Sequence, residues 1–443
     1  MYIGLIRICL LMGIFTISMS AMGIKEVLRE TIETNPHISQ KIHEYKEVVE
    51  DLQIAKKGWK PTLDYLGSMG KEWTKNSSTG FENVNYNVYQ HSLILTQNIF
   101  SGWSTTHQIN IQKARIAASA YHMIETVNDT AFNLVRYYIE VLKSKELLNV
   151  ANENIDIVDS IYQKVQKLYN AGLTTKSERN KVAASLALSK SNYITQENRL
   201  QNALYQFKFY YGKSVKTDDF IDPDTSFPMP HHYKDGLDRT LKNNPSIIVQ
   251  SYNIKVAKED YLEKKSKYYP KVDIELRRSW SRNLGAVVGR DDRYSALLKV
   301  QYNFFNGFKD KSTLQKGISK INKEAQLLEK TKREAMQTYD LSWAAYEELQ
   351  KQWKHLEEYK KYAVRTLRLY SKEFDMGKRS LLDLLSAQND IINSKSQIIR
   401  TKYNFMFAKY RILDSQGDLL TAILDKNRPY NLKEITDKLP KSK

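Results

Sequence analysis

The sequence predicts a mostly α-helical chain with a β part, built as a tandem duplication of long helical hairpins. Glycine-marked turns of the same layout recur 205 residues apart, at Gly172 and Gly377. Long segments without proline and almost without glycine indicate unusually long helices. Two further segments alternate apolar and polar residues, which is typical of β-hairpins.

Short sequence matches define the repeat. "NIFSGW" and "NFFNGF" are also 205 residues apart, whereas "TNPHI" matches "NNPSI" and "GWKPTLDY" matches "KYYPKVDI" at an offset of 209. The four extra residues of the first half therefore lie between Pro61 and Phe100. We expect two equivalent halves, residues 21–220 and 237–420. A linker, residues 221–236, joins them, and a tail, residues 421–443, follows.

The N-terminus has the features of a secretory signal peptide. Arg7 precedes the apolar stretch "ICLLMGIFTIS", and small residues follow at Ser18 and Ser20. We therefore expect residues 1–20 to be removed on export. The single cysteine, Cys9, lies within this segment, so the mature chain would carry no thiol, which suits an oxidising compartment.

Composition and charge narrow the classes of protein. Hydrophobic residues make up 41% of the chain and the mean hydropathy is −0.56, which excludes a polytopic helical membrane protein. The net charge of +18 makes a basic, nucleic-acid-binding coiled coil an alternative. Lys and Arg are, however, interspersed with Glu and Asp along helical faces, without a nucleic-acid motif. We therefore interpret the charge as solvated helix faces and expect no nucleic acid.

Each half is expected to contain one long helix and shorter helices beside it. We predict the long helices over 103–170 and 308–376, because proline is absent from both and glycine nearly so. At about 1.5 Å per residue each reaches about 100 Å. The shorter helices are predicted over about 36–58 and 175–211 in the first half and over 245–268 and 380–416 in the second. In each half their summed length roughly equals that of the long helix, so they could stack end to end beside it.

The segments of period two are predicted to form β-hairpins at about 62–100 and 271–305. In the second hairpin, Val272, Ile274 and Leu276 alternate with polar residues, and the returning strand does the same, while Arg278 breaks the apolar face.

The first hairpin is less regular. Its returning strand begins with apolar residues at Val84, Tyr86 and Val88 and changes phase before Leu93 and Leu95. We expect a β-bulge at that change of phase.

Two equivalent hairpins on helices about 100 Å long, in an exported protein, favour transmembrane strands over a half-buried soluble sheet. Lipid tolerates only closed sheets, and four strands cannot close a barrel of useful bore. The chain would therefore share a barrel with copies of itself. Two copies give eight strands and a filled interior, whereas three give twelve strands and a lumen, so a conduit favours a homotrimer.

The two glycine turns are the candidate functional sites. Glycine is common just beyond a helix C-terminus because it accepts positive φ. Thr175 and Glu178 then fit a capping box, and Ser380 with Asp383 is its aspartate variant. Capping alone, worth about 1 kcal/mol for each hydroxyl, is one interpretation. The other is that the turns also form a gate, which the resemblance described next implies.

With these features the chain resembles the TolC-like outer-membrane efflux protein family over nearly the whole mature sequence. The resemblance is carried by the duplicated layout, the Asn-Pro and Pro landmarks and the turns "AGLTTKSERN" and "GKRSLLDLLSAQNDI". The second turn is similar to that of members serving type I secretion. The resemblance implies a trimer with a twelve-stranded barrel in the outer membrane and an α-helical barrel across the periplasm, with no enzyme activity and no cofactor.

The resemblance also implies partners and gate residues. A periplasmic adaptor (membrane fusion) protein and an inner-membrane pump, either an ABC or a proton-driven transporter, would dock at the pinched inner end, where the turns at Gly172, Thr175, Gly377 and Ser380 lie. The gate positions match four residues of this chain: Ser177, Glu178, Arg379 and Asp383.

Two gate positions depart from the family pattern. Phe374 stands where a tyrosine is frequent, and Ser386 where a second acid can occur. The latch is therefore expected to rest mainly on Glu178 with Arg379.

Two interpretations compete with a channel or add to it. A soluble periplasmic coiled-coil scaffold would contain the same helices but no barrel. A metal site at His231 and His232 is disfavoured because no acid or cysteine cluster joins them, so we expect no metal and interpret their Pro-rich surroundings as the linker.

Overall fold

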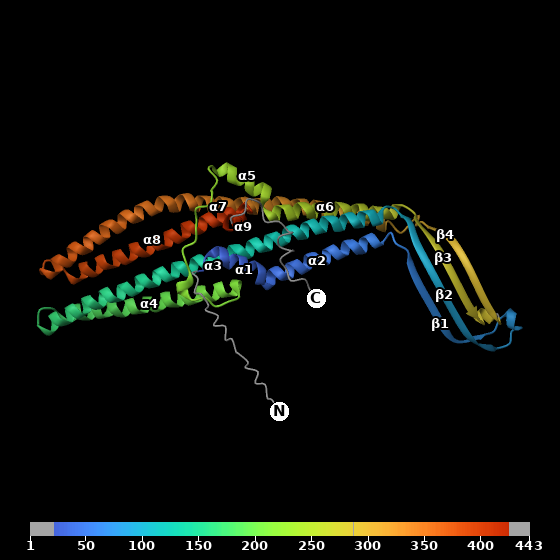
Figure 1. Ribbon diagram of the computed structural model, residues 1–443, viewed down its shortest axis with the longest axis horizontal. Helices are drawn as coiled ribbons and strands as arrows, with labels where there is room; N and C mark the ends of the chain where they lie inside the picture. The colour runs from blue at the N-terminus through green and yellow to red at the C-terminus, as the bar shows by residue number, and fades with distance from the viewer. Residues whose placement is uncertain (1–21, 287, 425–443) are drawn as a thin grey trace, which may run out of the picture.

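The computed structural model describes residues 22–286 and 288–424 of the chain. The predicted signal peptide, Cys9 and nearly all of the predicted tail lie outside these residues. The molecule is an elongated bundle of helices that continues at one end into a bent four-stranded sheet (Figure 1). None of the helices in the described part of the chain has an apolar stretch long enough to cross a bilayer.

Both halves contain the same series of helices and strands, and the second half ends in one additional short helix. The first half contains α1 (Ile24–Thr34), α2 (Pro36–Lys57), β1 (Thr62–Thr74), β2 (Val84–Ser101), α3 (Ser104–Asn170) and α4 (Lys176–Tyr211). The second contains α5 (Tyr233–Asn243), α6 (Pro245–Lys265), β3 (Lys271–Arg282), β4 (Arg290–Gln301), α7 (Lys309–Asp375), α8 (Leu381–Ser415) and the short α9 (Leu419–Ile423). The long helices α3 and α7 have 67 residues each.

Some boundaries differ from the expected ones. Strand β4 ends at Gln301, before the expected limit of 305, because the Asn303 side chain accepts a hydrogen bond from the Phe305 N–H at 3.0 Å and turns the chain toward α7. Helix α5 begins inside the expected linker, and α9 reaches into the expected tail.

The shorter helices stack end to end beside the long ones, and two asparagines join them (Figure 1). Asn35 caps the first turn of α2 through Oδ1 and donates from Nδ2 to the Tyr210 carbonyl at the end of α4, at 3.0 Å. Asn244 caps α6 in the same way and donates to the Ser415 carbonyl at the end of α8, at 3.1 Å. Each asparagine therefore satisfies donors at one helix start and an acceptor at one helix end.

The sheet is antiparallel in the order β1-β2-β3-β4. The outer strands β1 and β4 each pair on one side only, so the sheet of a single chain has two open edges. Between β2 and β3 the register shifts at Asn98 and Phe100, which marks an irregularity near the helices.

The expected bulge in the first hairpin is wrong. Strands β1 and β2 pair without interruption from Thr62 opposite Thr96 to Thr74 opposite Val84. The apparent change of phase arises because β2 carries apolar residues on both faces: Tyr86 and Leu93 point to opposite sides of a continuous strand.

The pairing register gathers apolar side chains on one face of the sheet. These side chains are Leu63, Tyr65, Met69, Trp73, Leu93, Leu95, Ile274, Leu276, Trp280, Tyr294, Leu298 and Val300. Arg278, which breaks the pattern in the sequence, lies on this face over the rings of Trp280 and Tyr294, at 5.5 and 4.9 Å, and pairs with Asp292. The opposite face is more polar, with Glu275 held between Arg277 and Lys299.

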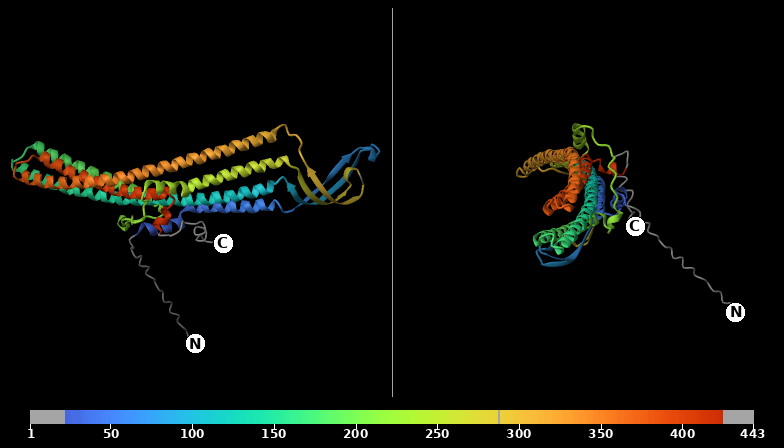
Figure 2. Two further views of the ribbon diagram at one scale, coloured as in Figure 1. Left: turned by 90° about the horizontal axis from the view of Figure 1, so that it is seen from above. Right: turned by 90° about the vertical axis from the view of Figure 1, so that its left-hand side faces the viewer.

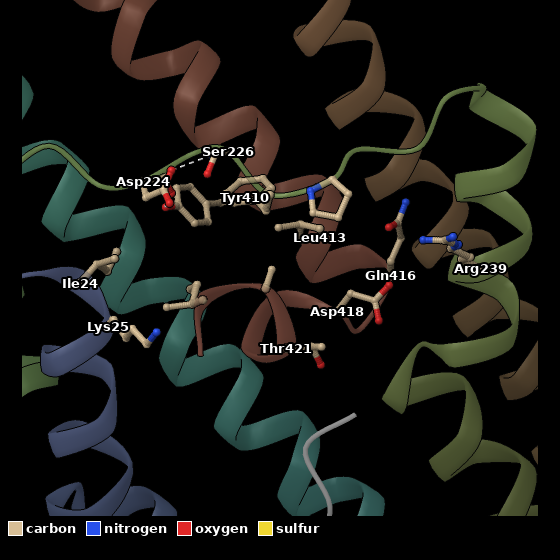
Figure 3. Close-up of a pocket in the computed structure, with 14 residues that line it drawn as sticks. Ile24, Lys25, Asp224, Ser226, Arg239, Tyr410, Leu413, Gln416, Asp418 and Thr421 are labelled. Carbon is tan, nitrogen blue, oxygen red and sulfur yellow. Dashed lines mark hydrogen bonds between the residues drawn. The ribbon is translucent and has the colours of Figure 1, made fainter. Parts of the chain in front are cut away.

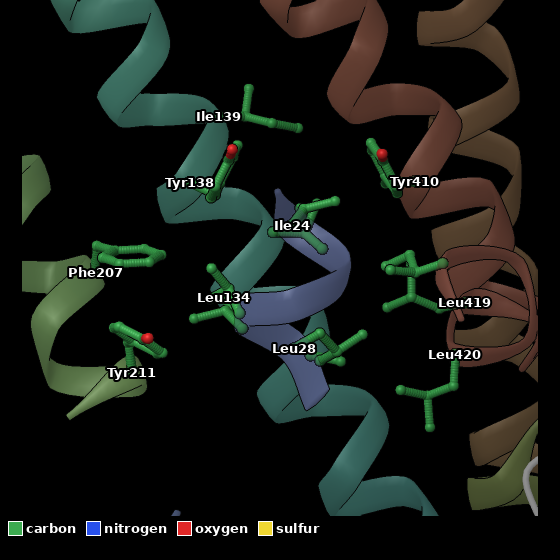
Figure 4. Packing of buried hydrophobic residues seen from close by; sticks show 14 of the residues in the cluster. Ile24, Leu28, Leu134, Tyr138, Ile139, Phe207, Tyr211, Tyr410, Leu419 and Leu420 are labelled. Carbon is green, nitrogen blue, oxygen red and sulfur yellow. The ribbon is translucent and has the colours of Figure 1, made fainter. Parts of the chain in front are cut away.

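The main hydrophobic core lies midway along the molecule, where α1 and α9 pack on the long helices (Figure 4). Its members include Ile24, Leu28, Leu134, Tyr138, Ile139, Phe207, Tyr211, Tyr410, Leu419 and Leu420. The Tyr138 hydroxyl lies 2.8 Å from the carbonyl oxygens of both Met22 and Ile221, which fastens the segment after α4 to α3.

Candidate functional site

The turn between α3 and α4 and the turn between α7 and α8 lie at the same end of the molecule, opposite the sheet (Figure 2). Helices α3 and α8 pack against each other, so the two hairpins are in contact. The tips of both hairpins therefore form one surface at the far end of the chain.

Each tip ends its long helix with the same glycine turn. Gly172 has φ of 73°, its N–H bonds to the Tyr169 carbonyl at 3.0 Å, and the next N–H bonds to Leu168 at 2.9 Å. Gly377 has φ of 70° and repeats these bonds to Phe374 at 3.0 Å and to Glu373 at 2.8 Å. Only glycine adopts this left-handed conformation without steric cost, which is why the helices break there.

Hydroxyl side chains start the helices that follow. The Thr175 hydroxyl accepts the Glu178 N–H at 3.2 Å, and the Ser380 hydroxyl accepts the Asp383 N–H at 3.2 Å. The expected capping boxes are incomplete, because neither acid reaches back to the cap N–H. The Glu178 carboxylate accepts from the Thr174 hydroxyl instead, and the Asp383 carboxylate accepts from the Ser380 hydroxyl at 2.8 Å.

Arg379 is held within its own tip. Its Nε and Nη2 both lie 2.8 Å from Oε2 of Glu373, and its guanidinium lies over the Tyr370 ring at 4.2 Å. The hydrogen bond that Arg379 donates to the Glu373 carboxylate raises the pKa of Arg379 above its ordinary value, so the charge persists at any physiological pH. Within a single chain Arg379 does not pair with Glu178.

A small apolar cluster joins the two hairpins behind the tips. It consists of Val165, Val182, Leu381 and Leu385, with Phe374 packed against it. Lys164 of α3 pairs with Asp375 of α7 and lies 5.6 Å from the centre of the Phe374 ring. Phe374 therefore supports packing and a cation contact where a tyrosine would add a hydroxyl.

The surface of the tips is partly apolar. Leu173, Met376 and Leu382 are 74, 61 and 58% exposed. Ser177 and Ser386 are exposed, and Asp383 is partly exposed. Apolar side chains of this size at one end of a long bundle favour contact with another protein.

Sequence reasoning missed the partners of two tip residues. Glu373 and Tyr370, which hold Arg379, lie on the last turns of α7, and their spacing of three residues along a helix was the available signal. The link between Lys164 and Asp375 joins residues more than 200 positions apart, and no local pattern announces it.

Within the described residues, no three His, Cys, Asp or Glu side chains are grouped to hold an ion directly, at the histidine pair or elsewhere. His231 and His232 are exposed just before α5.

A family model provides the decisive comparison. The model of the outer membrane efflux protein family matches the chain twice, over residues 27–213 and 236–413. The chain belongs to this family. The two matched segments correspond to the two halves of the tandem duplication.

Individual relatives of the efflux protein are distant in sequence. The outer membrane efflux protein BepC of Brucella suis biovar 1 (strain 1330) is 18% identical over 349 residues, which cover 77% of this chain and 74% of BepC. The Campylobacter jejuni CmeC outer membrane channel has a TM-score of 0.81 at 14% identity, covering 94% of this chain and 90% of that one. The open state of the Neisseria gonorrhoeae MtrE outer membrane channel has a TM-score of 0.75 at 14% identity, covering 94% of each chain.

Family membership determines the class and location of this efflux protein. It is an outer-membrane channel protein that extends into the periplasm, and it is not an enzyme. The expected resemblance and fold class are confirmed. The alternatives of a soluble periplasmic scaffold and of a nucleic-acid-binding coiled coil are thereby removed.

Proposed function

We propose that this protein forms a passive homotrimeric duct for export, opened at its periplasmic end when an adaptor protein and an inner-membrane pump dock. The observation that supports it best is the four-stranded sheet with open edges at β1 and β4. In lipid these edges require partner strands, since each unpaired backbone group costs several kcal/mol there. Three chains would give twelve strands and a lumen.

The tips are the proposed gate. Ser177, Glu178, Phe374, Arg379 and Asp383 all lie at the end of the hairpins, where three chains would bring them around one axis. Glu178 is part-buried and Arg379 remains charged, so a pairing between tips of neighbouring chains is electrostatically favourable. An exposed pair is worth about 0–1 kcal/mol, which docking can overcome, and threefold repetition makes the sum significant.

The tips are also the proposed docking surface for the adaptor. The turns at Gly172, Thr175, Gly377 and Ser380 present exposed apolar side chains beside them, above all Leu173 and Met376. Adaptor contacts there would bind the open arrangement better than the closed one, which is how a ligand shifts such an equilibrium.

Type I protein secretion is the proposed task, on the form of the second turn. Efflux of small molecules is the second candidate, favoured by the efflux proteins among the relatives. The culture-medium proteome and the drug sensitivity of a deletion strain separate them: missing secreted proteins support secretion, and raised drug sensitivity supports efflux.

Engineered cysteines test the assembly directly. Ser68→Cys in β1 is combined in turn with Arg293→Cys, Ser295→Cys and Leu297→Cys in β4, all on the polar face of the sheet. A closed trimer predicts cross-linked species of up to three chains for one of these pairs, and none for Ser68→Cys with Ser319→Cys in α7. A protein that carbonate washes from membranes, with no cross-linked species, contradicts the proposal.

A further inference from the structure

An acidic cavity lies at the joint where α6 begins and α8 ends, against α3 and α7. It has a volume of about 220 Å³. Four carboxylates border it, from Glu125, Asp129, Glu334 and Asp414. The larger cavity nearby, of about 600 Å³, contains both signs of charge, with Arg239 beside Asp418 (Figure 3). In the smaller cavity no Lys or Arg side chain is among the lining residues.

Two of the four carboxylates lack partners. Glu125 accepts hydrogen bonds from Ser246 and from His122, and Glu334 pairs with Lys330. Within residues 22–286 and 288–424, no side chain or backbone N–H forms a hydrogen bond or ion pair with the carboxylate of Asp129 or of Asp414. Asp129 is exposed where it borders the cavity, whereas Asp414 is half-buried.

A third oxygen points to a ligand. Asn128, on α3 next to Asp129, is 4% exposed and borders the same cavity. Its Oδ1 is buried and has no hydrogen-bond partner among the described residues. A buried carbonyl oxygen without a donor costs about 1–3 kcal/mol, so native structures normally satisfy it.

The electrostatics of the joint disfavour negative charge at Asp414. Asp414 lies in the last turn of α8, and that turn contains no basic residue. The carbonyl end of a helix repels an anion. Burial and, to a smaller extent, the charge of Asp129 raise the pKa of Asp414 to about 8, with Arg411 acting in the opposite direction. The titratable groups facing Asp129 are Glu125, His122 and His37.

We propose that this cavity binds a hydrated divalent cation, Mg²⁺ or Ca²⁺, between the carboxylates of Asp129 and Asp414 and the Oδ1 of Asn128. No three acidic or histidine side chains in the described part of the chain are close enough to ligate an ion directly. A cation that keeps most of its water fits this limit, because Mg²⁺ commonly uses one or two carboxylates and several waters. The cavity is large enough to hold an ion together with several of its waters.

The site would tie the two halves of the molecule together. Asn128 and Asp129 belong to α3 of the first half, and Asp414 belongs to α8 of the second, beside the bond from Asn244 to Ser415. A bound cation would therefore strengthen the joint between α6 and α8 against α3. This inference does not depend on which substrate the duct carries.

Mn²⁺ binding provides the test. Full-length protein in detergent is stripped with EDTA and titrated with Mn²⁺ above pH 8, where a larger fraction of Asp414 is ionised than at pH 7, and free Mn²⁺ is followed by electron paramagnetic resonance. We expect Asp414→Asn and Asp129→Asn to lower the affinity of the site for Mn²⁺ at least tenfold. At Mn²⁺ concentrations that just saturate the wild type, each variant should therefore bind about one ion per chain fewer. Mg²⁺ should raise the thermal midpoint of the wild type and leave that of Asp414→Asn unchanged.

Two controls separate this site from others. Asp383→Asn removes an acid at the tips, and Asp418→Asn removes a half-buried acid of the larger cavity, and both should retain the extra ion. Wild-type Mn²⁺ binding by both Asp414→Asn and Asp129→Asn overturns the proposal. The absence of a saturable Mn²⁺ site in the wild type also overturns it. In that case a proton, and not a cation, would neutralise Asp414.

Discussion

Gln388 of α8 donates from Nε2 to Oδ1 of Asn154 of α3 at 3.3 Å, and so links the second helical hairpin to the first. Asn154 in turn donates to the Ser189 hydroxyl of α4 at 3.0 Å. All three residues are buried, and Oε1 of Gln388 has no partner in the described part of the chain. A polar layer inside a coiled-coil seam lowers stability but fixes the alignment of the helices.

Breaking one side of this layer should destabilise the protein. Gln388→Leu leaves Oδ1 of Asn154 buried without its donor, at a cost of about 1–3 kcal/mol, and should lower the thermal midpoint of the purified protein. The double variant Asn154→Leu with Gln388→Leu should recover most of the loss. An unchanged or raised midpoint for the single variant would show that the bond contributes nothing.

The two joint asparagines should each contribute to stability. Asn35→Ala and Asn244→Ala each remove a helix cap and a bond to the end of the stacked helix, α4 or α8, so each should cost about 1–2 kcal/mol. Thermal unfolding in detergent measures the shift. Asn243→Ala is the matched control, because its exposed side chain makes no hydrogen bond within the described residues. Equal midpoints for Asn243→Ala and Asn244→Ala would contradict the assigned role.

Arg379→Ser should raise the single-channel conductance in planar bilayers. The substitution removes the cation that the proposed latch requires, and the pore would spend more time open. Lys176→Ser, which removes an exposed cation from the other tip, serves as the control and should conduct as the wild type does. Unchanged conductance in Arg379→Ser removes this residue from the gate.

The first tip should be required for export but not for assembly. Replacing residues 172–178 by an unrelated sequence should abolish export of the cargo, because the proposed adaptor contacts are lost. Detergent-stable trimers on electrophoresis, together with normal outer-membrane levels, show that the variant is folded. Continued export would place the adaptor elsewhere on the chain.

Much of the architecture follows from local signals in the sequence. Gly172 and Gly377 mark the ends of the long helices because the turn there needs a positive φ, which glycine adopts most readily. The Asn-Pro pairs mark the joints for a similar reason, since an asparagine cap and a proline at the first helical position act within one turn. Such features need no knowledge of the rest of the chain.

Contacts between distant segments could not be read in this way. The second bond of Asn35, to the end of α4, depends on stacking that the sequence only suggests through helix lengths. The pairing of Arg379 with Glu373 of α7 within the same tip was not expected, and the predicted pairing with Glu178 between tips stays a prediction. Strand β2 has apolar residues on both faces, and the sequence pattern was therefore misinterpreted as a bulge. Alternation identifies the two faces of a strand only when one of them is polar.

The open edges at β1 and β4 also constrain how the protein is made. A lone chain cannot enter the bilayer with both rows of backbone groups bare and wait there, because lipid supplies no hydrogen bonds. In the proposed homotrimer, encounter between subunits would therefore precede or accompany insertion. Assembly would then be a multimolecular reaction, whose rate falls steeply when few copies are synthesised.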